Sequence, residues 1–188
     1  MITGSLVELG PFGPELITDT YLSWLNDKSL MRYSRQRFEH HTRDSSIAYL
    51  RSFENSPNKF WAIYRRVDHL HVGTMTVYVD QVAGTADIGV LMGHPEARAK
   101  GFGREAWSLA MDYLFRVEGL NKVTGGTAAL NSAMVRVFHH WRMRLEEVER
   151  EAEVIEGRPT DVLRFGMLRD EWEKAYPHAI AQLAEKNR

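Results

Sequence analysis

The sequence predicts an α+β domain in which an antiparallel sheet comes first and helices and strands are mixed afterwards. Two observations support this fold class. Between residues 60 and 79, two segments rich in β-branched and aromatic side chains flank the short polar stretch 65–70, which is typical of an antiparallel hairpin. From residue 102 onward, apolar side chains recur every three to four positions, which indicates helices that pack on a sheet. A doubly wound parallel sheet is therefore disfavoured.

The first half of the chain is expected to contain four strands and two helices. The helices have apolar residues at helical spacing, and turn-forming or polar residues bound the strands. In chain order we expect a strand at 5–9, a turn at 10–13, a helix at 18–30, caps at 42–44 before a helix at 45–53, and strands at 60–64, 72–79 and 85–92.

The second half is expected to alternate helices and strands. Its strongest element is a helix after residue 101, which Gly119 stops. The apolar stripe of this helix consists of Trp107, Ala110, Met111, Leu114 and Val117. Residues 145–155 fit either a helix or a strand, and the turn-like Gly157-Arg158-Pro159 favours a hairpin. The remaining elements are a strand at 122–127, a helix at 132–141 with Asn131 as N-cap, strands at 145–155 and 162–168, and an amphipathic helix at 170–185.

Composition limits the kind of protein. With 188 residues, 44% of them apolar, the chain suits one domain spanning residues 1–188. The 24 Lys and Arg nearly balance the 25 Asp and Glu, which argues against a nucleic-acid-binding face. No apolar run approaches the ~20 residues of a membrane span, and the N-terminus lacks a signal-peptide pattern. We therefore expect a cytoplasmic protein with neither a nucleic-acid nor a membrane partner.

Two composition facts limit its chemistry. The absence of cysteine excludes disulfides, thiolate metal sites and cysteine nucleophiles. The eight histidines show no spacing that joins three metal ligands, so we expect no metal.

The segment Arg98-Ala99-Lys100-Gly101-Phe102-Gly103-Arg104 lies between a predicted strand and a predicted helix. Its two glycines let the backbone approach a ligand closely because no Cβ intervenes. The helix that follows offers unpaired N–H groups and the positive end of its dipole, and three basic side chains add full charges. This combination predicts a pyrophosphate site.

Two other interpretations fit parts of this segment. Taken alone, it is as typical of a solvated surface turn as of a phosphate site. Gly101, Gly103 and Ala106 also match the spacing of a dinucleotide fingerprint. That motif needs its first glycine directly after a strand and an acidic residue at the end of the next strand, and neither is present. We therefore reject the dinucleotide interpretation.

Three motifs together resemble the GNAT N-acetyltransferases. Arg98, Gly101 and Gly103 match the family signature of Arg or Gln, two residues, Gly, one residue, and Gly or Ala, and Lys100, Glu105 and Ala106 agree with its usual neighbours. The strand at 86–92 and Asn131-Ser132-Ala133 resemble the family's fourth strand and the start of its later helix. The resemblance extends over residues 5–172 and implies a mixed, mostly antiparallel sheet with splayed fourth and fifth strands, flanked by helices.

The resemblance implies acetyl-CoA as cosubstrate and assigns its contacts. Backbone groups of Ile88, Gly89 and Val90 would bind the pantetheine arm as an added strand does. The amides of residues 100–104, with Arg98, would hold the pyrophosphate, so Lys100, Gly101, Phe102, Gly103 and Arg104 are cofactor-binding residues. Asn131 would contact pantetheine from the opposite side, and Phe138 would contact the cofactor near the departing thiol.

The chain departs from the family pattern near the leaving thiol. Phe138 stands where relatives often have a tyrosine beside the thiolate, Met134 replaces a common serine, and His140-Trp141-Arg142-Met143 replaces Lys-x-Gly-Phe. We expect direct attack of an amine on the thioester, with backbone N–H groups stabilising the developing oxyanion. Asp87 is the candidate base, and Ser132 or water the candidate acid.

The N-terminal third resembles the branch related to ribosomal-protein and amino-sugar acetyltransferases. The segments that carry this resemblance are 16–21, 24–27, 37–38, 41–42 and 169–172. It implies a small-molecule amine, first of all a nucleotide-linked amino sugar. Arg32, Arg35 and Arg37 could hold its phosphates, and Trp24 could form a wall of the acceptor pocket. Acetylation of a protein N-terminus, a non-catalytic acyl-CoA-binding module and a homodimer remain open alternatives.

Overall fold

The computed structural model describes residues 1–178 and 182–183 and confirms the α+β prediction. The strands are β1 (Ile2–Thr3), β2 (Val7–Pro11), β3 (Lys59–Arg65), β4 (Leu70–Asp80), β5 (Thr85–Met92), β6 (Lys122–Ala128), β7 (Arg144–Ile155), β8 (Arg158–Leu168) and β9 (Gln182–Leu183). The helices are α1 (Asp19–Asn26), α2 (Arg43–Arg51), α3 (Phe102–Arg116), α4 (Ser132–His140) and α5 (Arg169–Ala175), with 3₁₀ turns η1 (Pro14–Leu16), η2 (Arg35–Phe38) and η3 (Pro95–Ala97).

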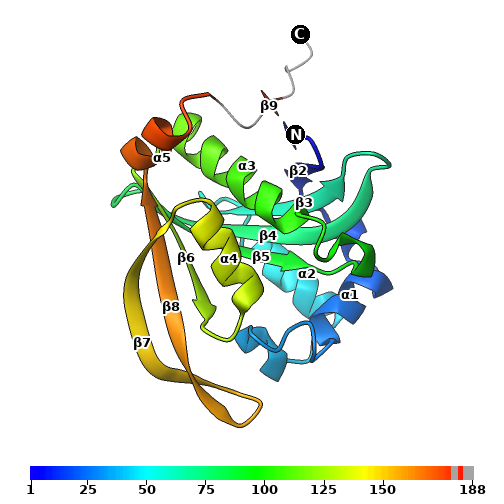
Figure 1. The fold of residues 1–188 in the computed structure, drawn as a ribbon. Helices are drawn as coiled ribbons and strands as arrows, with labels where there is room; N and C mark the ends of the chain where they lie inside the picture. The colour runs from blue at the N-terminus through cyan, green and yellow to red at the C-terminus, as the bar shows by residue number, and fades with distance from the viewer. Residues whose placement is uncertain (179–181, 184–188) are drawn as a thin grey trace.

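One sheet joins all the described strands, in the order β7-β8-β6-β5-β4-β3-β2-β1-β9. Neighbouring strands are antiparallel except for β5 and β6, which are parallel. Helices α3 and α4 cover one face of the sheet, and α1 and α2 lie against the other (Figure 1). The long β7–β8 hairpin forms one edge of the sheet and curves away from the other strands (Figure 1).

Each face of the sheet has its own core. On the α3 side, Ala86 and Ile88 of β5 pack with Leu109 and Leu114 of α3, and all four are buried. On the α1–α2 side, a second cluster forms around Phe12, Tyr21, Trp24 and Phe60, and Leu91 packs against it. Because side chains alternate along a strand, β5 contributes Ala86 and Ile88 to one face and Asp87, Gly89 and Leu91 to the other.

Helices α1, α2 and α4 begin at side-chain caps, and the sequence predicts those of α2 and α4. The hydroxyl of Thr18 accepts a hydrogen bond from the N–H of Tyr21, and Thr42 forms a reciprocal capping box with Ser45. The side chain of Asn131 accepts from the N–H of Met134 and caps α4, as predicted. Helix α3 differs from these three, because its N-cap residue is Gly101 and no side chain accepts a hydrogen bond from its first N–H groups.

The predicted hairpin of 145–155 and 162–168 is confirmed as β7 and β8. Its two connecting residues, Glu156 and Gly157, both have positive φ (50° and 77°), as a tight type I′ connection requires.

Three predicted elements are wrong in detail. The helix at 18–30 ends at Asn26, and residues 28–30 form a turn. The helix at 170–185 ends at Ala175, because Pro177 cannot donate an N–H and disfavours helical geometry at Tyr176. Gln182 and Leu183 instead pair with β1, while residues 179–181 and 184–185 of that prediction lie outside the described part. Pro11, predicted to lie in a turn, is the last residue of β2 and pairs with Trp61. Within the described residues, no helix is long and apolar enough to cross a membrane.

Candidate active site

The parallel strands β5 and β6 separate soon after they begin. They pair only at Thr85–Lys122, Ala86–Val123 and Asp87–Thr124. Strand β5 then continues to Met92 and β6 to Ala128 without a further pair between them (Figure 1). The β6-facing edge of Ile88, Gly89 and Val90 therefore has no strand partner among the described residues. The expected splay is confirmed, and an extended group can add to this edge as a strand would.

The open edge of β5 leads into the predicted phosphate loop. The N–H groups of Gly93 and His94 donate to the carbonyl of Val72, which attaches the start of the loop to β4. Ala99 and Gly101 have φ of 59° and 84°, so the backbone turns sharply before α3 begins. The first amides of a helix have no intrahelical acceptor, and here no side chain caps them. Residues 102–104 thus present N–H groups at the positive end of the α3 dipole.

The side chains of the loop have different roles. Lys100 and Arg104 are exposed beside the helix start. An Nη group of Arg98 donates to the carbonyl of Gly93 (3.1 Å), so this arginine stabilises the loop itself. The ring of Phe102 is buried in the core, which leaves only its backbone available to a ligand. At Gly103, a Cβ would lie 3.1 Å from Cγ of Met92, so a larger residue needs the Met92 side chain to shift by only a few tenths of an ångström.

Glu105, in the first turn of α3, holds the N-terminal segment in place. Its carboxylate accepts hydrogen bonds from the N–H groups of Ser5 (2.9 Å), Leu6 (2.7 Å) and Val7 (2.8 Å), and from the hydroxyl of Ser5. The sequence prediction missed this contact. The only local signal for this contact is an acidic residue at the start of a helix. Such a residue usually interacts with the positive end of the helix dipole, so it indicates no partner far away in the sequence.

Asp87 lies where β5 and β6 separate. Its Oδ2 accepts a hydrogen bond from Oγ1 of Thr124 (2.8 Å), and Tyr78 is its cross-strand neighbour on β4. Burial raises the pKa of the Asp87 carboxyl, while the Thr124 hydroxyl and the positive charge of Arg164 act in the opposite direction. The carboxyl is half-buried on the α1–α2 face, opposite the face that α3 covers. Sequence spacing alone gave no reason to select Thr124 or Arg164.

The predicted residues of α4 occupy different environments. Asn131 uses both ends of its amide within the protein, because it caps Met134 and donates to Oγ1 of Thr127 (3.0 Å). Ser132 is exposed, and its hydroxyl accepts from Arg136 (3.3 Å).

Phe138, predicted to contact the cofactor, is fully buried instead. Its ring lies 5.2 Å from that of Trp107 and 4.7 Å from that of Phe165. The structure therefore places Phe138 in the hydrophobic core rather than on an accessible surface beside β5. A tyrosine at this position would bury its hydroxyl between the rings of Trp107 and Phe165, so we expect Phe138→Tyr not to supply a proton to the thiolate.

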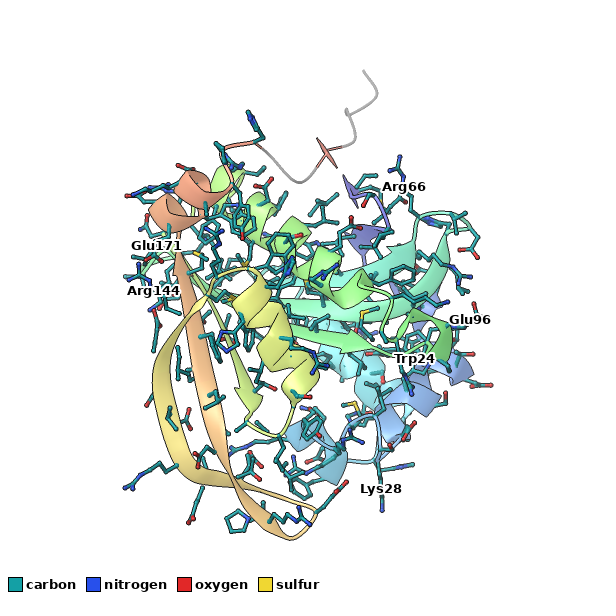
Figure 2. The ribbon with its side chains drawn as sticks, viewed as in Figure 1. Trp24, Lys28, Arg66, Glu96, Arg144 and Glu171 are labelled. Atoms are coloured by element: carbon teal, nitrogen blue, oxygen red, sulfur yellow. The ribbon has the colours of Figure 1, made fainter. Side chains whose placement is uncertain are left out.

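The residues predicted to bind the acceptor amine, Trp24, Arg35 and Arg37, make contacts with other residues of the protein. Trp24 is buried, and its ring lies against Gly93 at the start of the phosphate loop, where a Cβ would come within 2.0 Å of it (Figure 2). Arg35 and Arg37 both pair with Glu153 of β7, with N–O distances of 2.5 and 2.9 Å. These ion pairs join η2 to the β7–β8 hairpin. Arg32 stacks on Tyr33 instead, 4.7 Å from the ring centre.

The described residues contain no group of three His, Asp or Glu side chains that could hold an ion. His71 is packed among aromatic rings, and Nε2 lies 3.0 Å from the carbonyl of Gly73. Burial lowers the pKa of His71 to about 4, so its imidazole is neutral at physiological pH.

A splayed parallel strand pair next to an uncapped, glycine-rich helix start is an arrangement that can accept an extended group carrying phosphates. Residues 7–144 match the family model for the acetyltransferase (GNAT) domain, which is well over half of the chain. The chain therefore belongs to the GNAT N-acetyltransferase family. Enzymes of this family are acyltransferases that use acetyl-CoA.

Known proteins agree with this assignment. Over 122 residues the chain is 30% identical to the uncharacterized N-acetyltransferase p20 of Bacillus licheniformis, covering 64% of this chain and 67% of that protein. A GNAT acetyltransferase from Bacillus anthracis has a TM-score of 0.76 at 17% identity, covering 90% of this chain and 99% of the other. The spermidine N-acetyltransferase of Vibrio cholerae, solved with CoA and spermine, has a TM-score of 0.77 at 20% identity, covering 89% and 98%. The two solved structures share the fold of this chain.

Proposed function

We propose that this acyltransferase binds acetyl-CoA along the open edge of β5 and transfers its acetyl group to a small-molecule primary amine. The observation that carries the proposal is the continuity of two features. The unpaired edge of residues 88–90 leads, through one short loop, to the uncapped amides of residues 102–104. An extended pantetheine arm suits the first feature and a pyrophosphate suits the second. Lys100 and Arg104 add positive charge beside the phosphates.

The chemistry follows from the position of Asp87. A new C–N bond forms as the amine attacks the thioester carbon, the C–S bond breaks, and CoA leaves as the thiolate. Backbone N–H groups on the open edge of β5 stabilise the negative charge that develops on the acetyl oxygen. Asp87, directly or through water, accepts the proton that the ammonium must lose before attack, and the second proton, which the nitrogen loses as the amide forms, passes to water. A carboxylate whose pKa is raised by burial is a better base than an exposed one.

Water is the proton source that we propose for the thiolate. Ser132, the side chain considered from sequence, is exposed, and Phe138 has no proton to give. The released thiolate needs no buried acid, because its proton can come from solvent.

For the acceptor, the finer proposal is a nucleotide-linked amino sugar. The resemblance of the N-terminal third to amino-sugar acetyltransferases supports it. A diphosphate bound at Arg35 and Arg37 would have to displace Glu153 from both guanidinium groups. Acceptor binding at that place would therefore loosen the link between η2 and the β7–β8 hairpin.

Calorimetry with acetyl-CoA tests the proposed binding site. Gly103→Glu adds bulk and a negative charge where the amides would meet the pyrophosphate, so binding should be abolished while the circular dichroism spectrum stays native. The matched control is Arg158→Glu, which adds a negative charge at the turn of the β7–β8 hairpin and should bind normally. Unchanged affinity in Gly103→Glu would refute the proposed site. A thiol-release assay over a panel of amines then tests acetyl transfer.

A further inference from the structure

Arg164 of β8 lies flat across β6. Strands β6 and β8 are antiparallel, and Arg164 pairs with Gly126. A Cβ built on Gly126 would lie 3.0 Å from Nη1, 3.3 Å from Cδ and 3.5 Å from Cζ of Arg164. The arginine side chain therefore lies over the bare backbone of Gly126, at a point where β6 no longer pairs with β5. Any other residue at position 126 would occupy this space.

This guanidinium lies on the same face of the sheet as Asp87. Along β6, Val123 is buried in the α3-side core and Gly125 faces the Trp107 ring, so Thr124 and Gly126 face the other way. Thr124 donates its hydroxyl hydrogen bond to Asp87 on that face. Asp87 and Arg164 therefore stand on opposite sides of the opening between β5 and β6. The influence of the Arg164 charge on the pKa of Asp87 agrees with this placement.

The guanidinium group of Arg164 is held through its Nε atom, and its two Nη atoms are available to a ligand. Its Nε donates to Oε1 of Glu149 on β7 (2.8 Å), which holds the side chain from the far side. Across the described residues, neither Nη atom of Arg164 makes a hydrogen bond to a protein group. Arg37 differs, because its Nη groups bond to Glu153 and to the carbonyls of Ser34 and Val154. An anchored guanidinium with free Nη donors has the geometry that binds carboxylate or phosphate oxygens.

We propose that Arg164 is a specificity residue that binds an anionic group of the acceptor while Asp87 receives its ammonium. The acceptor class is then an amine that also carries a carboxylate or a phosphate. Opposite charges on the two sides of the opening would orient such a molecule with its nitrogen toward the thioester. This inference rests on the proposed function, because it assumes that the acceptor enters from the face that Asp87 occupies.

The test uses matched acceptors that differ only in the anionic group. Glucosamine 6-phosphate is compared with glucosamine for phosphate, and serine with serine amide for carboxylate. In the wild type, kcat/KM should be higher for the anionic member of at least one pair. In Arg164→Ala that value should fall roughly ten- to a hundredfold, the effect of one charge-assisted contact. The neutral member and the KM of acetyl-CoA should change less than about twofold, and Arg164→Lys should recover part of the loss.

The control is Arg158→Ala, which removes a positive charge from the same hairpin at its turn and should leave both members of each pair unchanged. Equal losses for the anionic and neutral members, or no loss for either, would overturn the specificity role. If acetyl-CoA binds but no amine is acetylated, the inference is tested by calorimetry of glucosamine 6-phosphate and of serine in the presence of CoA. Binding that Arg164→Ala weakens supports the inference, and absence of binding refutes it. Failure to bind acetyl-CoA at all would instead refute the proposed function.

Discussion

Replacement of Glu105 by alanine should destabilise the whole domain, although the residue lies in the first turn of α3 and is only partly buried. The carboxylate accepts three backbone N–H groups and one hydroxyl from residues 5–7, which precede and begin β2. Alanine would leave all four donors without their acceptor. The N-terminal segment would then lose its attachment to the helix that also carries the proposed pyrophosphate site.

The magnitude follows from the burial of each donor. Ser5 and Leu6 are exposed, so water can replace most of what their N–H groups lose. Val7 is completely buried, and its N–H would have no such replacement. A hydrogen bond to a charged group contributes about 1.5–3 kcal/mol when its loss leaves a buried partner unsatisfied. We therefore expect Glu105→Ala to lower the free energy of unfolding by about 2–3 kcal/mol, which corresponds to a melting temperature roughly 4–10 °C lower.

Urea unfolding followed by circular dichroism measures this change. Glu105→Gln is the informative companion, because its amide keeps one acceptor oxygen and turns an NH₂ group toward the other donors. It should lose about half as much stability as Glu105→Ala. Glu173→Ala, at an exposed position of α5, controls for removal of a carboxylate and should stay within about 0.5 kcal/mol of the wild type. A loss below about 0.5 kcal/mol for Glu105→Ala would refute the argument.

Two further substitutions test separate points. Asp87→Asn should reduce kcat/KM by about 10²- to 10⁴-fold and abolish the acidic limb of the pH–rate profile, and an unchanged profile would exclude Asp87 as the base. Because burial raises the pKa of Asp87, the folded state favours the protonated carboxyl group. The contribution of this group to the free energy of unfolding is lost as pH rises through the pKa that it has in the folded protein. In urea unfolding Asp87→Asn should therefore be more stable than the wild type at pH 8, with the difference vanishing toward pH 3. Arg142 has a φ of 57° just after α4, where the family usually has glycine, so Arg142→Gly should raise the free energy of unfolding by about 0.5–1 kcal/mol, and a loss of stability would contradict this.

The strand and helix positions of the middle of the chain were predictable because their signals are local. The period of two in β3 and β4, the glycine-rich start of α3 and the asparagine that caps α4 can each be recognised within a few neighbouring residues. The early end of the C-terminal helix also has a local cause, because Pro177 stops it at Ala175 although the helical periodicity continues to residue 185. The family motif around Arg98, Gly101 and Gly103 identified the place of the candidate pyrophosphate site because its residues are close together in the sequence.

What each candidate site residue contacts was decided by the tertiary structure. Sequence suggested that Arg35 and Arg37 were free to bind phosphate, but Glu153, more than a hundred residues away, engages both. Phe138 aligns with a family site position, yet it packs between Trp107 and Phe165.

The sequence by itself determined the fold class, the family and the position of the glycine-rich loop, since these depend on periodicity and on residues adjacent in the chain. Strand order and register decided the rest. They place Thr124 beside Asp87, Arg164 over Gly126, and residues 5–7 on Glu105. Such contacts join segments that are far apart in sequence, and their formation depends on which strands pair and in which register, which no local pattern of residues records.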